Sequence, residues 1–114
     1  MRKITTLTII TKTDDLMDEI FDAITQYPKS EKYSLGTDTK NSALAFYRLI
    51  ITAAKKYYKK TTLKDADVEL CTLKYFIRRG HNHRFMSTKR YERISRAIEE
   101  VGRMLGGWIN STNK

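Results

Sequence analysis

The chain is poor in the residues that crosslink or interrupt protein structure, with one cysteine, one proline and five glycines among 114 residues. The single cysteine, Cys71, cannot form a disulfide within the chain, which agrees with a reducing compartment. The sequence also lacks an apolar run near the roughly eighteen residues of a membrane span, and it shows no cleavable signal segment. These absences exclude a disulfide-stapled or membrane-spanning class, so we expect a cytoplasmic protein.

What is present is typical of a folded, helix-rich domain: 40% hydrophobic and 31% charged residues. The net charge is +9, and it is unevenly distributed. Residues 1–36 carry five Lys/Arg against six Asp/Glu, whereas residues 37–114 carry seventeen against seven. This asymmetry predicts a polyanionic partner, with nucleic acid first, an acidic protein second and an anionic membrane surface third.

Residues 87–110 give the strongest helix pattern in the chain. Apolar residues recur there at steps of three and four, which places them on one face of a helix that must be buried: Tyr91, Ile94, Ile98, Val101, Leu105 and Trp108. Basic residues fill much of the opposite side: Lys89, Arg90, Arg93, Arg96 and Arg103.

Three glycines in this helix require a separate explanation. Gly102, Gly106 and Gly107 each cost about 1 kcal/mol relative to alanine in a helix interior. The close approach of another backbone is the reason we expect. We therefore assign these glycines, together with Trp108, to helix packing or to contacts between subunits.

The rest of the chain predicts three more helices and an N-terminal tail. Residues 1–12 show a loose alternation that indicates a short strand or an extended or disordered tail. Thr13 is a suitable N-cap for a helix that ends before Pro28. Thr37 or Asp38 can cap the next helix, which closes on KKYYKK, and a third follows with Gly80 as its C-cap.

Four amphipathic helices joined by short connections must bury their apolar stripes against one another. The sequence therefore predicts an all-α fold, an antiparallel up-down-up-down four-helix bundle over residues 13–111.

The basic residues of the later helices fall into three groups that can bind phosphates: Lys55, Lys56, Lys59 and Lys60; Lys74, Arg78, Arg79 and Arg84; and Lys89 to Arg103. The alternative is an ordinary solvated face. No helix-turn-helix, RNA-recognition or zinc-finger signature is present, so the sequence does not support base-specific recognition. Tyr57, Tyr58 and Tyr75 lie among these cations and can stack on bases. Half-burial at the edge of the bundle is the interpretation we favour for these tyrosines.

Evidence for catalysis or metal binding is weak. Cys71, His81 and His83 do not match an ordinary zinc spacing, so we expect no metal and no cofactor. Arg78 and His83 form an Arg-x4-His spacing that some small helical ribonucleases use, with the histidine as acid or base. This ribonuclease hypothesis stays as an alternative to a protein without catalytic activity.

Residues 100–109, EVGRMLGGWI, resemble the C-terminal motif of the accessory variability determinant (Avd) proteins of diversity-generating retroelements. These proteins belong to a wider group of small four-helix bundles that includes the ribosomal-RNA intervening-sequence proteins. Residues 65–78 and 28–36 are similar to looser, earlier motifs of the family, and the resemblance covers about residues 16–111. Because the intervening-sequence relatives usually lack the Gly-Gly-Trp ending, the resemblance favours Avd.

The resemblance implies a homopentameric barrel that binds the retroelement reverse transcriptase and contacts RNA or DNA during mutagenic retrohoming. It implies no catalytic residues. The family's basic surface corresponds to Lys74 and Arg78, and with them we include the neighbouring basic positions in the expected binding surface: Arg79, Arg84, Lys89, Arg90, Arg93, Arg96 and Arg103. The alternative from the same group is an RNA-binding protein of the intervening-sequence type.

Overall fold

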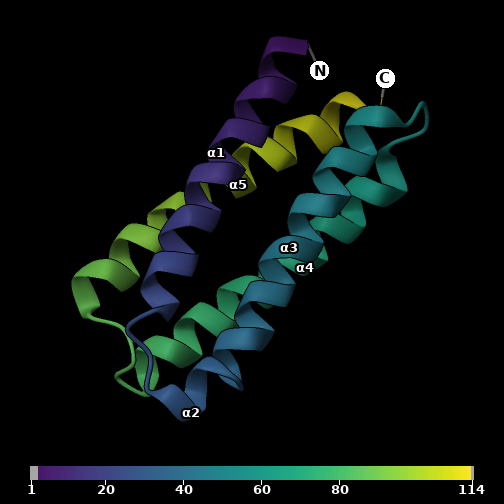
Figure 1. The fold of residues 1–114 in the computed structure, drawn as a ribbon. Helices are drawn as coiled ribbons and strands as arrows, with labels where there is room; N and C mark the ends of the chain where they lie inside the picture. The colour runs from purple at the N-terminus through teal and green to yellow at the C-terminus, as the bar shows by residue number, and fades with distance from the viewer. Residues whose placement is uncertain (1–2, 114) are drawn as a thin grey trace.

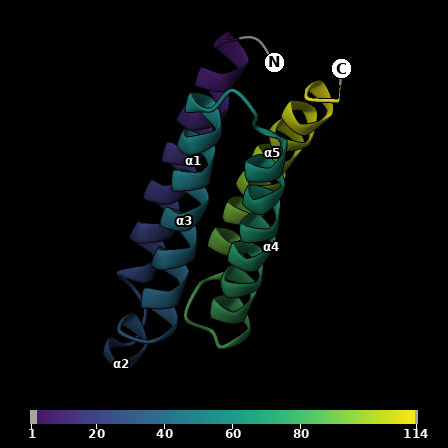
Figure 2. The same cartoon turned by 90° about the vertical axis from the view of Figure 1, so that its right-hand side faces the viewer.

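The computed structural model describes residues 3–113, and all of its regular structure is helical (Figure 1). The helices are α1 (Lys3–Ile24), α2 (Lys29–Lys32), α3 (Leu35–Lys55), α4 (Lys60–Asn82) and α5 (Thr88–Ser111). Each long helix packs on two others: α1 and α4 both contact α3 and α5. Figure 2 shows α1 and α3 on one side of the bundle and α4 and α5 on the other. The predicted all-α bundle of four antiparallel helices is confirmed.

The core is formed by the apolar stripes of the four long helices. On α5 the predicted stripe is buried, and Ile94, Leu105 and Trp108 have exposed fractions of 0%, 0% and 2%. Tyr91 is only partly buried, and its ring stacks on that of His81 at 4.2 Å between centroids. Within residues 3–113, no helix is both long enough and apolar enough to cross a membrane.

The predicted N-terminal tail is wrong for residues 3–12, which form the first half of α1. Ile9 is fully buried on the same face as Leu16, so this segment contributes to the core. Thr13 is not an N-cap: its hydroxyl donates to the carbonyl oxygen of Ile9 at 2.7 Å, one turn back inside the helix. Such a bond satisfies the threonine hydroxyl within the helix, so threonine does not prevent this stretch from being helical. Residues 1–2 lie outside the described part of the chain.

Two other predicted helix ends are also wrong. The segment before α3 contains the one-turn helix α2. Helix α3 begins at Leu35, so the predicted N-caps Thr37 and Asp38 lie inside it, and the hydroxyl of Thr37 donates to the carbonyl oxygen of Lys32 at 3.0 Å. Gly80 lies inside α4, which continues to Asn82. Among residues 3–113, the left-handed backbone conformation occurs at Arg84, with φ 64°.

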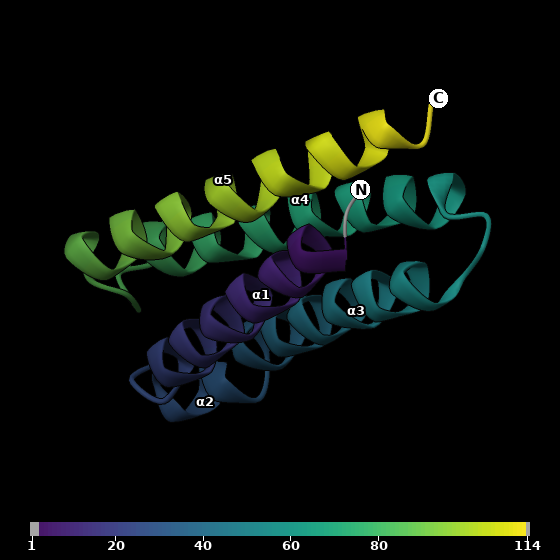
Figure 3. The ribbon, with the colours of Figure 1, turned by 90° about the horizontal axis from the view of Figure 1, so that it is seen from above.

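The two ends of the bundle differ in what they bring together. At one end, which we call the terminal end, the start of α1, the end of α5 and the connection between α3 and α4 meet (Figure 3). At the other, the α2 end, lie α2 and the connection between α4 and α5 (Figure 1).

Candidate nucleic-acid interface

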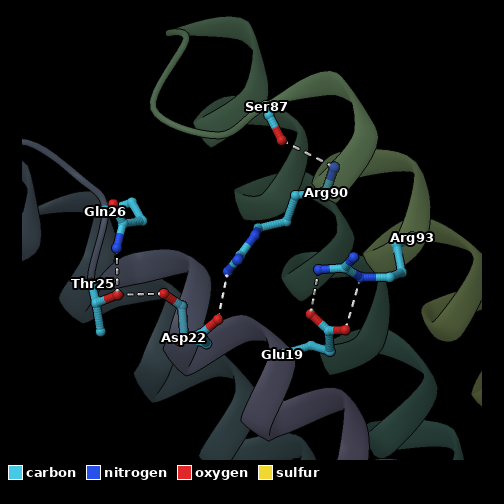
Figure 4. Close-up of polar contacts among 7 residues, drawn as sticks. All are labelled: Glu19, Asp22, Thr25, Gln26, Ser87, Arg90 and Arg93. Atoms are coloured by element: carbon cyan, nitrogen blue, oxygen red, sulfur yellow. Dashed lines mark hydrogen bonds and ion pairs between the residues drawn. The ribbon is translucent and has the colours of Figure 1, made fainter.

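Two of the predicted binding arginines are engaged in ion pairs within the chain. Arg93 meets Glu19 of α1 with two contacts, Nε to Oε1 at 2.8 Å and Nη2 to Oε2 at 3.2 Å. Arg90 meets Asp22 of α1 through Nη1 and Oδ2 at 3.0 Å. Figure 4 shows both arginines reaching from α5 to these carboxylates. Arg90 and Arg93 therefore tie α1 to α5, and their charges are compensated inside the molecule.

The start of α5 sets the direction in which its arginines point. Ser87 has an extended backbone, and its hydroxyl accepts a hydrogen bond from the backbone N–H of Arg90 at 3.1 Å (Figure 4). Serine at this position satisfies one of the free N–H groups of the first turn. The cap thus fixes where the helix begins and, with it, which residues face α1 and which face solvent.

Three basic residues of α5 are exposed and form no ion pair with any residue between 3 and 113: Lys89, Arg96 and Arg103. We call them the α5 row. They are seven residues apart, so they lie along one side of the helix about 10.5 Å from one another. Arg96 and Arg103 line a shallow hollow of about 550 Å³. Glu99 and Glu100 also border this hollow, and Glu100 is paired with Lys12 at 3.3 Å.

Lys74 and Arg78 of α4, which we call the α4 pair, are also exposed and without an ion pair in the described chain. They follow Leu70 at steps of four residues, and Leu70 lies beneath Gly102 of α5. The pair therefore continues along the edge of α4 nearest α5. The guanidinium of Arg78 lies over the ring of Tyr75 at 5.7 Å, which holds it against the helix surface.

Arg79, Arg84 and the two histidines lie near the α2 end. Arg79 donates to Nε2 of His83 at 2.8 Å, and His81 is 3.1 Å from the hydroxyl of Thr88. Arg84 is exposed in the connection after α4.

These contacts do not support the ribonuclease hypothesis. Nε2 of His83 is bonded to Arg79, whereas the guanidinium of Arg78 lies over the ring of Tyr75. Arg78 lies within α4, whereas His83 follows the end of that helix and its side chain meets Arg79. Nor do residues 3–113 contain a group of three or more His, Cys, Asp or Glu side chains able to hold a metal ion.

The glycines of α5 do not have the close backbone neighbour expected within the chain. A Cβ atom at Gly102 would meet only Leu70 Cδ2, at 3.5 Å, an ordinary contact. At Gly106 and Gly107 it would meet nothing in the described chain within 4 Å. Trp108, by contrast, is buried in the chain's own core. The glycines thus leave part of the surface of α5 without bulky side chains.

The comparison with known families matches residues 7–112 to a family model described as bAvd-like. The chain belongs to the bAvd-like family. Membership implies that this bAvd-like protein is an accessory protein of a diversity-generating retroelement. The match begins inside α1 and ends just after α5, so it covers all of the bundle except the first turn of α1. No curated protein matches the chain.

In this bAvd-like protein, the motif over residues 100–109 is the second half of α5 and has two sides. Val101, Leu105 and Trp108 point into the core. Arg103 and Gly107 are exposed. The motif therefore combines residues that hold the bundle together with residues that are available to a partner.

Proposed function

We propose that this protein is a non-enzymatic accessory factor that binds the retroelement's reverse transcriptase together with RNA or DNA and so supports mutagenic retrohoming. The family supports the role in the retroelement. One observation supports the nucleic-acid part: the α5 row and the α4 pair are exposed cations that form no ion pair with a carboxylate of residues 3–113.

The arrangement suits the phosphate backbone rather than base edges. Arginine offers several N–H donors in a planar fork that matches phosphate oxygens, and three of these five residues are arginines. Phosphate contacts position a nucleic acid but read no sequence. Binding through this surface is therefore strongest at low salt and differs little between sequences.

Self-association is a further part of the proposal. The family resemblance implies a homopentamer, and the open surface at Gly106 and Gly107 is suited to close contact with a second copy. Glycine allows helices to approach each other closely because it carries no side chain. Light scattering of the purified protein measures the subunit number directly.

The nucleic-acid role is tested by reversing the α4 pair. Lys74→Glu with Arg78→Glu is compared with Lys29→Glu and Lys32→Glu on α2, which change the net charge equally at another site. We expect the α4 variant to lose most of its binding to labelled RNA and DNA in an anisotropy titration, and the α2 variant to keep it. Circular dichroism checks that both stay helical. Equal binding by the two variants contradicts the assigned surface.

The polymerase part has its own test. The protein is co-expressed with a tagged reverse transcriptase of a diversity-generating retroelement, and the complex is purified with nuclease and high salt to remove bridging nucleic acid. We expect it to co-purify with the polymerase. Complete loss after nuclease treatment contradicts direct binding.

A further inference from the structure

The connection between α3 and α4, residues 56–59, carries two adjacent tyrosines that project into solvent at the terminal end. Tyr57 and Tyr58 are 87% and 83% exposed, and their rings meet edge to face with centroids 4.8 Å apart. The half-burial favoured from the sequence is therefore wrong for these two. Tyrosine usually buries most of its ring, so this degree of exposure calls for an explanation.

The charge around these tyrosines is positive. No acidic residue lies between Asp38 and Asp65, and the part of this stretch next to the tyrosines contains five basic residues: Lys55, Lys56, Lys59, Lys60 and Lys64. The other two segments that reach the terminal end, residues 3–13 of α1 and residues 101–113, also lack carboxylates. By contrast, acids are interspersed with the cations toward the α2 end, where Asp22 pairs with Arg90.

Two of the lysines hold the connection in shape. The ammonium of Lys59 donates to the carbonyl oxygen of Ala53 at 3.0 Å and to that of Lys56. Lys56 donates to the hydroxyl of Thr62 at 3.0 Å. The bonds of Lys59 satisfy carbonyl groups at the end of α3, where cations are favoured. The turn that contains the two tyrosines is thus held by hydrogen bonds, and Lys55 and Lys60 are exposed beside it.

A hollow of about 460 Å³ lies behind the connection. Tyr57, Tyr58 and Lys60 line it on one side, and Thr6 of α1 and Thr112 after α5 line it on the other. Its volume lies within the range of about 300–1,000 Å³ that is typical of small-molecule sites.

We propose that this connection binds single-stranded nucleic acid, with bases stacked on Tyr57 and Tyr58 and the adjoining phosphates held by Lys55 and Lys60. Exposed aromatic rings set among cations are the combination that binds single strands without sequence preference. A duplex keeps its bases stacked inside and cannot offer their faces to the rings. The inference rests on the proposed function, since it assumes a nucleic-acid partner, and it adds a contact about 27 Å along α4 from Arg78.

The test uses the full chain with Tyr57→Ala and Tyr58→Ala combined, titrated into a fluorescein-labelled single-stranded 20-mer and a 20-base-pair duplex. We expect the single-strand affinity to fall at least about 5-fold for each base that stacks, and the duplex affinity to stay within about 2-fold. The matched control is Tyr33→Ala, which removes a tyrosine of 78% exposure next to α2. It is expected to bind like the unmodified chain.

Two further variants separate stacking from other uses of the site. Tyr57→Phe with Tyr58→Phe keeps the rings and is expected to keep the single-strand affinity. Lys55→Ser with Lys60→Ser is expected to reduce the salt slope of single-strand binding by about 0.7 for each phosphate that these lysines neutralise. All of these residues are exposed, and unchanged thermal melting confirms that each variant is folded.

Several results overturn the proposal. If the double alanine variant binds the single strand normally while reversal of the α4 pair abolishes binding, this site is refuted and the proposed function stands. If the unmodified chain binds neither oligonucleotide at low salt, the proposed function itself fails. Stacking is ruled out if the double alanine variant loses equal affinity for the single strand and the duplex. It is also ruled out if the double phenylalanine variant binds the single strand as weakly as the double alanine variant. Loss of reverse-transcriptase binding alone makes the connection a protein contact instead.

Discussion

Replacing Gly80 with alanine tests the packing at the α2 end of the bundle. A Cβ atom there would lie 2.2 Å from the hydroxyl oxygen of Tyr27 and 3.0 Å from its Cζ. Tyr27 is only 3% exposed, and its ring packs against that of Phe85 with centroids 5.5 Å apart. The ring therefore cannot move aside without disturbing the core.

Two effects of opposite sign determine the size of the change. Alanine is favoured over glycine in a helix by about 1 kcal/mol. Overpacking a filled core costs about 1–3 kcal/mol, and an enclosed ring at such short distance places Gly80→Ala in the upper part of that range. We expect a net loss of about 1–2 kcal/mol in the free energy of unfolding, or about 4–8 °C in melting temperature.

The assay is thermal unfolding followed by circular dichroism at one protein concentration. In a Tyr27→Phe background the nearest atom to the new methyl group becomes Cζ at 3.0 Å, so we expect Gly80→Ala to cost close to nothing there. Gly102→Ala is the matched control, since its Cβ would make only an ordinary contact at 3.5 Å and should stabilise by up to about 1 kcal/mol. The reasoning is refuted if Gly80→Ala stabilises like the control, or costs the same in both backgrounds.

Three other predictions concern pH, an ion pair and assembly. Burial raises the pKa of the Tyr27 hydroxyl above its ordinary value of about 10, so ionisation opposes folding, and the free energy of unfolding should fall as the pH rises above about 10. The measurement is the urea midpoint from pH 8 to 11, and Tyr27→Phe should make its decrease with pH smaller. In a double-mutant cycle, Arg93→Ala and Glu19→Ala should show a coupling energy of about 0.5–1 kcal/mol, and this energy should be smaller in 1 M salt. A coupling energy that does not change with salt contradicts the prediction. Gly106→Ala and Gly107→Ala should raise helix stability but shift the light-scattering mass toward the monomer, and an unchanged mass excludes these glycines from a subunit contact.

The bundle could be predicted from the sequence because its strongest signal is local. Apolar residues at three- and four-residue steps located the buried face of α5, including Leu105 and Trp108. The same local reasoning failed for residues 3–12, because threonine and isoleucine are compatible with either a strand or a helix. Burial of Ile9 against the other helices decided between them, and no short-range pattern reveals such a contact.

The candidate site depended more heavily on contacts between residues distant in sequence. Charge counting identified the basic helices but could not show that Arg93 meets a carboxylate 74 residues earlier in the chain. Nor could it distinguish the exposed Tyr57 from a half-buried ring, because that depends on where the turn after α3 lies relative to the ends of α1 and α5. The separation into paired and unpaired cations is therefore a result of the fold.

The central claim is that the unpaired cations of α4 and α5 bind phosphates, and one comparison within α5 tests it. Arg96→Gln with Arg103→Gln and Arg90→Gln with Arg93→Gln remove the same charge from the same helix, but only the second pair of arginines is bonded to α1. The measurement is the slope of log affinity against log salt for a 20-base-pair duplex, to which each phosphate contact contributes about 0.9. We predict that the slope falls by about 1.8 for the first variant and stays nearly unchanged for the second. Equal changes in both variants, or no change in either, contradict the account.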